Sequence, residues 1–315
     1  MSTLAPTLEA FFIQRLAAQR QASPHTVAAY RDAFRLLLNF AWKRTGTPPS
    51  QLDIATIDAP LVGDFLAHLE ADRGNGVRTR NARLAAIRSL FRYAALRHPE
   101  HAGLIQQVLA IPPKRYRRAL VSFLHPDEID ALLAAPDRTS WTGRRDHALL
   151  LVAVQTGLRV SELIHITRAD VHIGIGAYLR CDGKGRKERV VPLTKQTVAV
   201  LQTWLAERGG QPTDPVFPSR RGGPISRDAV ERLLARHAAS AAQRCPTLRT
   251  KTLSPHVLRH TAAMQLRAAG VDISVIALWL GRVVGSDRKC QTMTRMDRAT
   301  ATRALSLPLR LTRRR

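Results

Sequence analysis

The 315-residue chain contains little cysteine, few aromatic side chains and about half as many acidic as basic residues. Its three cysteines, Cys181, Cys245 and Cys290, are odd in number and far apart, which argues against a disulfide framework or a zinc site. No run of about 18 uninterrupted apolar residues occurs, so the sequence offers no candidate membrane span. The first ten residues lack a basic head followed by an apolar block. We therefore expect a protein of the reducing cytoplasm without a secretory signal.

The shortage of acidic residues leaves a large positive charge. Lysine and arginine total 49 against 24 aspartate and glutamate, a formal net charge of +25. Such an excess favours a polyanionic partner, because each neutralised phosphate releases condensed counterions. A solvated surface or a codon bias towards arginine would explain the same number, and without an amphipathic anchor a membrane surface is less favoured. The charge alone therefore indicates nucleic acid as the first candidate partner.

Residues 1–98 are predicted to form a helical domain. Segments 8–19, 60–71 and 79–97 show apolar residues at helical spacing, and Ser23 before Pro24 is a typical helix start. The helix that starts there has the apolar stripe Val27, Tyr30, Phe34, Leu37, Leu38 and Trp42. Basic residues on the outer faces suit a DNA clamp, although a generic helical bundle would show the same stripes.

A change of composition marks residues 99–123 as an interdomain linker. The stretch 111–118 is proline-rich and then strongly basic, without a clear helical stripe. Its prolines favour an extended chain that could lie along phosphates. A merely solvated linker is the alternative.

Residues 124–281 are predicted to form a second domain that is mainly helical with a small β-sheet, making the whole chain α+β. The range 178–193 alternates in polarity around a Gly-Lys-Gly turn and is predicted to be a β-hairpin. Helices are expected from His125 to Pro136 and over 143–156, 196–208, 226–244, 255–269 and 273–280.

Three motifs follow one another in this domain. They are Thr-Gly-Leu-Arg-Val-Ser-Glu-Leu at 156–163, Gly-Lys-Gly-Arg-Lys-Glu-Arg-Val-Val-Pro-Leu at 183–193, and His-Val-Leu-Arg-His-Thr at 256–261. Each alone is weak, because an arginine after a helix-ending glycine or a lysine in a turn is usually a surface residue. Together, in this order and on a predicted helix end, hairpin and helix, they are specific.

In sequence, order and spacing the three motifs resemble the tyrosine recombinase, or phage integrase, family, and the resemblance runs from about Thr3 to Gly281. It implies a helical, SAM-like core-binding domain followed by a catalytic domain of the DNA breaking-rejoining fold, closing as a clamp on duplex DNA. It also implies strand exchange at inverted-repeat sites through a 3′-phosphotyrosine, with no cofactor and no metal, by proteins that act as tetramers on DNA.

The residue types suit this chemistry. Arg159 and Arg259 could bind the charge that develops on the phosphate oxygens through bidentate hydrogen bonds. Lys184 at the hairpin tip could protonate the leaving 5′-oxygen, and His256 could bind the phosphate or take the nucleophile's proton. Glu162 matches the family's acidic position and is expected to orient the site. Further candidate DNA contacts are Arg78, Arg80, Arg83, Arg115, Arg117, Arg118 and Lys187.

The family pattern fails after Gly281. Arg282 stands where the family has histidine or tryptophan, and about nine residues later, near Gln291, no tyrosine is found. The four tyrosines of the sequence, Tyr30, Tyr93, Tyr116 and Tyr178, all lie upstream. Residues 282–315 contain nine arginines and one lysine against two aspartates. The clean edge indicates a shifted reading frame near codon 282, and a natural tail that binds DNA is the alternative.

Two functions therefore remain open. The first is a site-specific recombinase fold that has lost covalent cleavage, and the second is a non-enzymatic DNA-binding protein that occupies recombination sites. In both cases the partner is double-stranded DNA and not a membrane. Because the family links its subunits through the C-terminal segment, we expect this chain to be monomeric in solution.

Overall fold

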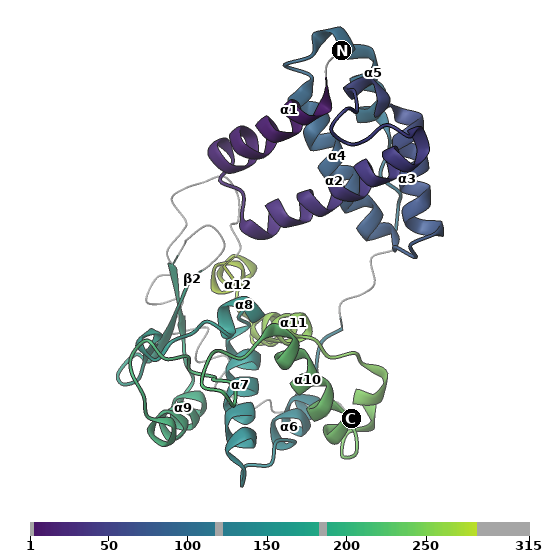
Figure 1. Ribbon diagram of the computed structural model, residues 1–315. Helices are drawn as coiled ribbons and strands as arrows, with labels where there is room; N and C mark the ends of the chain where they lie inside the picture. The colour runs from purple at the N-terminus through teal and green to yellow at the C-terminus, as the bar shows by residue number, and fades with distance from the viewer. Residues whose placement is uncertain (1–2, 117–121, 183–187, 282–315) are drawn as a thin grey trace. The chain divides into compact units, whose positions relative to one another are not determined.

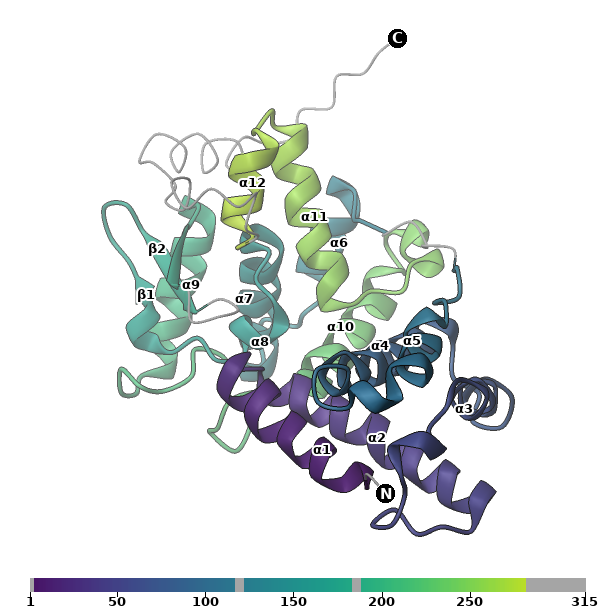
Figure 2. The same ribbon diagram turned by 90° about the horizontal axis from the view of Figure 1, so that it is seen from above.

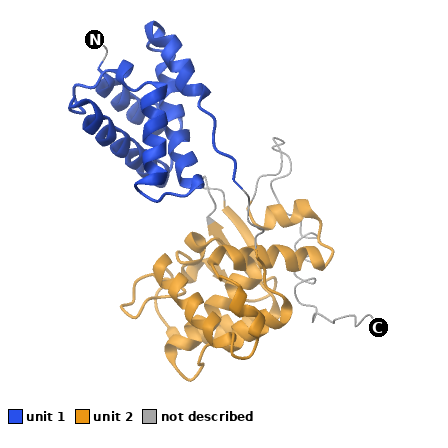
Figure 3. Ribbon diagram, turned by 90° about the vertical axis from the view of Figure 1, so that its right-hand side faces the viewer, with its two compact units in different colours: residues 1–119 blue, residues 120–315 orange. Residues whose placement is uncertain are grey.

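The computed structural model describes residues 3–116, 122–182 and 188–281. The chain divides into two compact units, residues 1–119 and 120–315 (Figure 3). Each unit has a hydrophobic core of its own.

Unit 1 is helical, as the sequence predicts. Its elements are α1 (Leu4–Ala10), which continues as a π-helix (Phe11–Gln19), α2 (Pro24–Thr45), α3 (Ala59–Ala71), α4 (Val77–Ala94) and α5 (Ala102–Ala110), with short 3-10 turns at Ile54–Thr56 and Pro99–His101. The predicted start of α2 is confirmed: the Ser23 side chain accepts a hydrogen bond from the Thr26 N–H, and Pro24 is the first helical residue. At the centre of the core the Phe11 ring stacks on Tyr30 and meets Phe34 and Tyr93 edge-on.

The predicted linker over 99–123 is too long. Helix α5 lies inside this range, and its Ile105 and Val108 are fully buried in the core of unit 1. The next residues are also attached to unit 1, because the Asn81 side chain donates to the Lys114 carbonyl (2.8 Å) and accepts from the Lys114 N–H (3.0 Å). Pro99 and Pro112 flank α5, and prolines in such positions are typical of linkers. The helix between them is nevertheless part of the helical domain.

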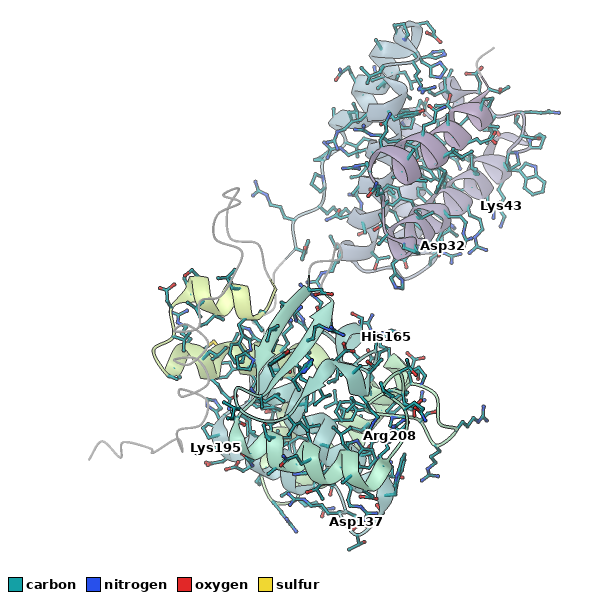
Figure 4. All side chains as sticks on the ribbon, turned by 90° about the vertical axis from the view of Figure 1, so that its left-hand side faces the viewer. Asp32, Lys43, Asp137, His165, Lys195 and Arg208 are labelled. Atoms are coloured by element: carbon teal, nitrogen blue, oxygen red, sulfur yellow. The ribbon has the colours of Figure 1, made fainter. Side chains whose placement is uncertain are left out.

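Unit 2 is built around helix α7 (Trp141–Thr156), which begins at the Ser140 cap and ends at Gly157. Its other elements are α6 (Pro126–Ala134), α8 (Val160–Leu163), a 3-10 turn at Arg168–Asp170, β1 (Val171–His172), β2 (Tyr178–Asp182), β3 (Glu188–Pro192), α9 (Lys195–Arg208), α10 (Arg227–Ala241), a 3-10 turn at Pro246–Thr250, α11 (Pro255–Ala268) and α12 (Ile273–Trp279). Helices α6, α9 and α11 pack against α7, which runs between α9 and α6 in Figure 1. Figure 2 shows α11 beside α12, and Lys195 and Arg208 mark the two ends of α9 in Figure 4. Because α7 has neighbours on several sides, its residues 148–154 form an unbroken apolar run.

The predicted hairpin is confirmed, and it belongs to a three-stranded antiparallel sheet in the order β1-β2-β3. Arg180 pairs with Val190 and Cys181 with Arg189, and the pairing runs over all five residues of each of these strands. Strand β1 has only two residues, too few for an alternation that sequence could reveal. The chain is thus mainly helical with a small sheet, as predicted, and within the described ranges no helix is long and apolar enough to cross a membrane.

Glu128 connects the start of α6 to residues 247–251 of unit 2. It accepts hydrogen bonds from the His125 N–H (2.8 Å), the Thr247 hydroxyl (2.7 Å) and the Lys251 ammonium (2.6 Å). Burial by itself would raise the pKa of Glu128, but the hydrogen bonds from Lys251, His125 and Thr247 outweigh it and hold the pKa below its ordinary 4.5. The ionised carboxylate is therefore part of the folded state.

We expect this contribution to disappear in acid. Because the folded pKa lies below the unfolded one, the stabilisation is complete above pH 4.5 and is lost as the pH falls through the folded value. Glu128→Gln should cost about 1.5–3 kcal/mol at pH 7 and flatten the decline below pH 4.5. Denaturant unfolding of unit 2, followed by tryptophan fluorescence at several pH values, measures both the loss of stability at pH 7 and the slope of its decline in acid. Glu231→Gln, which breaks the exposed pair with Arg227, is the control and should change stability by less than about 1 kcal/mol; an equally steep acid decline in both variants contradicts the role of Glu128.

Candidate active site

The turn after α7 places the first predicted site arginine. The backbone of Gly157 is left-handed (φ 63°), and its N–H caps the helix on the Ala153 carbonyl. A Cβ at this position would lie 2.8 Å from Leu280 Cδ2 and 3.0 Å from Ala262 Cβ. Only glycine therefore lets the chain turn here and approach α11 and the end of α12. Arg159, two residues later, is the N-cap residue of α8.

Arg159 and Glu162 form an ion pair across the first turn of α8. The Glu162 carboxylate accepts from the Arg159 backbone N–H (2.8 Å) and from its guanidinium Nη1 (2.8 Å). Arg159 Nη2 lies 3.5 Å from the Gly281 carbonyl oxygen. The glutamate is buried, whereas the Arg159 side chain stays 35% exposed. Glu162 therefore holds the Arg159 guanidinium through Nη1, while about a third of the Arg159 side chain remains exposed.

Arg259 enters the same region from α11. Its side chain is buried, and its guanidinium donates to the Gly157 carbonyl (2.7 Å) and to the Leu280 carbonyl. It thus joins the end of α7 to the end of α12. The two predicted phosphate-binding arginines are brought together here, because both contact backbone carbonyls of the Leu280–Gly281 turn. Arg159, Glu162 and Arg259 thus lie in one region of unit 2, around the end of α7 and the Leu280–Gly281 turn.

The end of α12 is held by further contacts. Trp279 is buried, and its indole N–H donates to the Thr156 carbonyl (3.0 Å). Gly281 is left-handed (φ 62°), and a Cβ there would lie 3.0 Å from the guanidinium of Arg189. Trp279 and Leu280 therefore belong to the core of unit 2, and Gly281 follows them at the surface beside Arg189.

Arg189 on β3 is a site residue that the sequence reasoning missed. Its guanidinium donates two hydrogen bonds to Glu162 (2.7 and 2.9 Å), and its Nε donates to the Trp279 carbonyl (3.2 Å). A signal was present in the sequence, because the period-2 alternation of a strand puts residue 189 on the same face as the buried Val191. An arginine on the inward face of a strand needs an anionic partner, and that partner is Glu162.

The electrostatics of the cluster keep Glu162 ionised. Burial alone would raise the pKa of Glu162, but the hydrogen bonds and the charge of Arg189, with those of Arg159, hold it below its ordinary value. Burial would likewise lower the pKa of Arg189, and Glu162 more than restores it. The Glu162 carboxylate is thus already shared between the guanidiniums of Arg159 and Arg189.

The other predicted site residues fall into two groups. His256 lies exposed in the first turn of α11, one helical turn before Arg259 and on the same side of the helix. Lys184, Lys187, Arg117, Arg118 and Arg282 lie outside the described residues. The structure therefore describes the two arginines, the histidine and the glutamate of the predicted set.

Arg80, one of the predicted DNA contacts in unit 1, is mostly buried in the structure. Arg80 is 7% exposed, donates to the Pro112 carbonyl (3.4 Å) and lies 4.0 Å from Glu70, so its guanidinium is used inside the domain. Arg78 and Arg115 are exposed, and Arg78 lies over the Tyr116 ring. Arg83 is partly buried; burial, with the nearby Arg73, lowers its pKa.

Residues 122–283 match the model of the phage integrase family, and residues 10–98 match the phage integrase N-terminal SAM-like domain. A putative integrase/recombinase, y4rC of Sinorhizobium fredii, is 57% identical over 282 residues, which cover 89% of this chain and 84% of the relative. Tyrosine recombinase XerC of Pelobacter propionicus is 34% identical over 95% of this chain and 94% of its own length.

Solved structures share the fold at low sequence identity. The XerH site-specific recombinase bound to palindromic difH substrate, in a post-cleavage complex, has a TM-score of 0.66 and 21% identity, covering 84% of this chain and 75% of that one. A lambda integrase tetramer bound to a Holliday junction has a TM-score of 0.62 and 21% identity, covering 91% and 76%. These similarities concern the fold of the polypeptide.

The packing at Gly157 leads to a stability prediction. We expect Gly157→Ala to destabilise unit 2 by about 2–4 kcal/mol, since a left-handed backbone and a clash with Leu280 and Ala262 add together. Gly270→Ala is the matched control: its φ is +80°, but among the described residues nothing lies within 4 Å of an added Cβ, and about 1 kcal/mol is expected. Urea melts of both variants measure the difference, and equal losses would show that the Leu280 contact adds nothing.

Proposed function

Because the chain belongs to the phage integrase family of tyrosine recombinases, we propose that it binds double-stranded DNA at inverted-repeat recombination sites and grips a phosphodiester with Arg159 and Arg259. The observation that carries the proposal is the convergence of these two arginines on the Leu280–Gly281 turn, one of them buried and the other part-exposed. Relatives named as integrases and recombinases support it. Guanidiniums at this place would stabilise charge on the non-bridging oxygens.

The remaining roles follow from the same chemistry. In transesterification a nucleophile attacks phosphorus, the P–O bond to the 5′-oxygen breaks, and that oxygen takes a proton. Lys184 is proposed to supply this proton, and His256 to bind the phosphate or accept the nucleophile's proton. Glu162 orients Arg159. No cofactor or metal is proposed for these steps, and the protein is proposed to work in the cytoplasm, where DNA is available.

We further propose that this chain does not cleave DNA covalently. No tyrosine follows Tyr178 in its 315 residues, while Arg159 is held by Glu162 and Arg259 by the Gly157 carbonyl. Purified protein incubated with a nicked suicide duplex should give no covalent protein–DNA adduct on a denaturing gel. An adduct that maps to any residue of the chain would refute the loss of cleavage.

The second candidate function is a DNA-binding protein that occupies recombination sites without acting on them. The net charge of +25 favours it, because such a surface persists whether or not a nucleophile is present. A footprint confined to inverted repeats supports this function, whereas uniform protection of any duplex leaves only non-specific charge. Tetramers on paired sites and monomers in solution are proposed for the assembly, and sedimentation with and without DNA distinguishes them.

Salt dependence tests the DNA contacts of unit 1. The logarithm of the association constant should fall linearly with the logarithm of salt concentration, and Arg115→Ala should weaken binding on all sequences and reduce the slope by about 0.9. Arg80→Ala is the informative comparison, since Arg80 is buried against Pro112 and Glu70. It should lower the melting temperature of unit 1 with little change of slope. A slope that changes equally in both variants would contradict the distinction between the two arginines.

A further inference from the structure

The Glu162 carboxylate has all four of its acceptor positions filled. Oε1 accepts from Arg159 Nη1 (2.8 Å) and Arg189 Nη1 (2.9 Å), and Oε2 accepts from the Arg159 backbone N–H (2.8 Å) and Arg189 Nη2 (2.7 Å). Glu162 is therefore shared between two guanidiniums that arrive from different elements, α8 and β3.

The two arginines differ in their exposure. The side chain of Arg189 is 12% exposed and that of Glu162 is 5% exposed, so the bidentate pair between them is shielded from water. The side chain of Arg159 is 35% exposed. Two guanidiniums and one carboxylate carry a net charge of +1, and the exposed edge of Arg159 is where that charge can act on a ligand.

Without Arg189 the balance would change. Arg159 and Glu162 alone would be neutral as a pair, and a buried carboxylate with a single counter-ion binds that counter-ion strongly. Arg159 would then be held by its own glutamate and would offer less charge to an anion. Arg189 thus neutralises the very group that would otherwise compete with a phosphate for Arg159.

We propose that Arg189 is a positioning residue that neutralises Glu162 and so leaves the charge of Arg159 available to a phosphodiester. The inference rests on the proposed function, because it assigns Arg159 to a phosphate. It adds a residue that touches neither DNA nor the reacting atoms.

The same side chain also connects the strand to the end of α12. Arg189 Nε donates to the Trp279 carbonyl (3.2 Å), two residues before the Gly281 carbonyl that lies 3.5 Å from Arg159 Nη2. Strand β3 is thereby tied to the Leu280–Gly281 turn that Arg159 and Arg259 both contact. Loss of Arg189 would loosen this connection together with the charge balance.

A merely structural ion pair would predict a different result. If Arg189 only stabilised unit 2, its replacement would lower the melting temperature and leave anion binding at Arg159 unchanged in the folded protein. The two roles are separated by measuring phosphate binding at Arg159 itself.

The experiment uses the full chain with isotope-labelled arginine and inorganic phosphate as the probe, at constant ionic strength. The Arg159 side-chain resonance is assigned by its absence from Arg159→Lys, and its shift is followed by NMR during the titration. Arg189→Met should weaken phosphate binding about tenfold, and Arg189→Lys, which keeps the charge, only about threefold. Arg180→Met, which breaks the more exposed Arg180–Asp170 pair on the adjacent strand, is the control and should leave the affinity within about twofold.

A double variant makes the test sharper. Glu162→Gln combined with Arg189→Met removes both partners of the buried pair, so Arg159 is no longer held by an uncompensated carboxylate, and its affinity for phosphate should return to within about threefold of the parent. A folded Arg189→Met with unchanged affinity, or a double variant as weak as the single one, overturns the positioning role of Arg189. If the parent chain shows no phosphate-dependent shift at Arg159, the proposed function fails first, and the inference falls with it.

Discussion

Replacing Asp146 by alanine is expected to lower the free energy of unfolding of unit 2 by about 3–5 kcal/mol. Asp146 lies on α7 and is completely buried. Its Oδ1 accepts from Arg145 Nε (3.0 Å) and Nη2 (2.7 Å), and its Oδ2 is 2.6 Å from Arg236 Nη2 and 2.9 Å from His237 Nε2. Removing the carboxylate leaves the buried guanidinium of Arg145 without its counter-ion, and the cost arises from that uncompensated charge.

Denaturant melts monitored by the tryptophans of unit 2 measure the loss. Asp228→Ala is the matched control, because Asp228 is exposed in the first turn of α10, and removing it should cost less than about 1 kcal/mol. Burial would raise the pKa of Asp146, but hydrogen bonds from His237 and Arg145 hold it below its ordinary value, so the same stabilisation should be lost in acid. A loss of less than about 1 kcal/mol in Asp146→Ala would mean that the contacts of Asp146 with Arg145, Arg236 and His237 contribute little to the stability of unit 2.

Local rules predicted the elements whose signals lie within a few residues. Ser23 followed by Pro24 predicted the start of α2, and the alternation of polar and apolar residues on both sides of residues 183–185 predicted the paired strands β2 and β3. Helix α5 was missed although Ile105 and Val108 are spaced as on one helix face, because the flanking prolines favoured a linker. Arg80 was placed outside, yet it is four residues before the buried Leu84 and thus on the buried face of α4.

The site shows where sequence reasoning must stop. The order of the motifs pointed to Arg159, Glu162 and Arg259 as candidate site residues, because family resemblance carries information about residues that are distant along the chain. The partners of these residues are long-range: Arg189 meets Glu162 across 27 positions, and Asp146 meets His237 across 91. A single sequence shows that a charged residue sits on an apolar helix or an inward strand position. Which opposite charge neutralises it depends on the packing of whole elements, and only the structure supplies that.

The second prediction concerns what the chain lacks. Replacing residues 282–315 by a segment with the family pattern, histidine or tryptophan directly after Gly281 and a tyrosine about nine residues later, should produce a covalent adduct on a nicked suicide duplex where the parent gives none. The physical reason is that the junction is already held: Arg259 donates to the Leu280 carbonyl, and Trp279 donates to the Thr156 carbonyl (3.0 Å). The graft would therefore start from a fixed point beside the two arginines.

Three variants decide whether the grafted activity uses the proposed site. The same segment with phenylalanine in place of its tyrosine should form no adduct. In the active graft, Arg159→Ala and Arg259→Ala should each slow adduct formation about 10²–10³-fold, the usual effect of removing a group that stabilises developing charge. Because Arg259 is also buried against Gly157, its variant must be shown to melt as a folded protein, and Arg159→Lys serves as the milder comparison. A graft that folds and binds DNA but forms no adduct would show that residues 1–281 cannot activate a phosphodiester, because a nucleophile would then be present and the arginines would still fail to promote its attack.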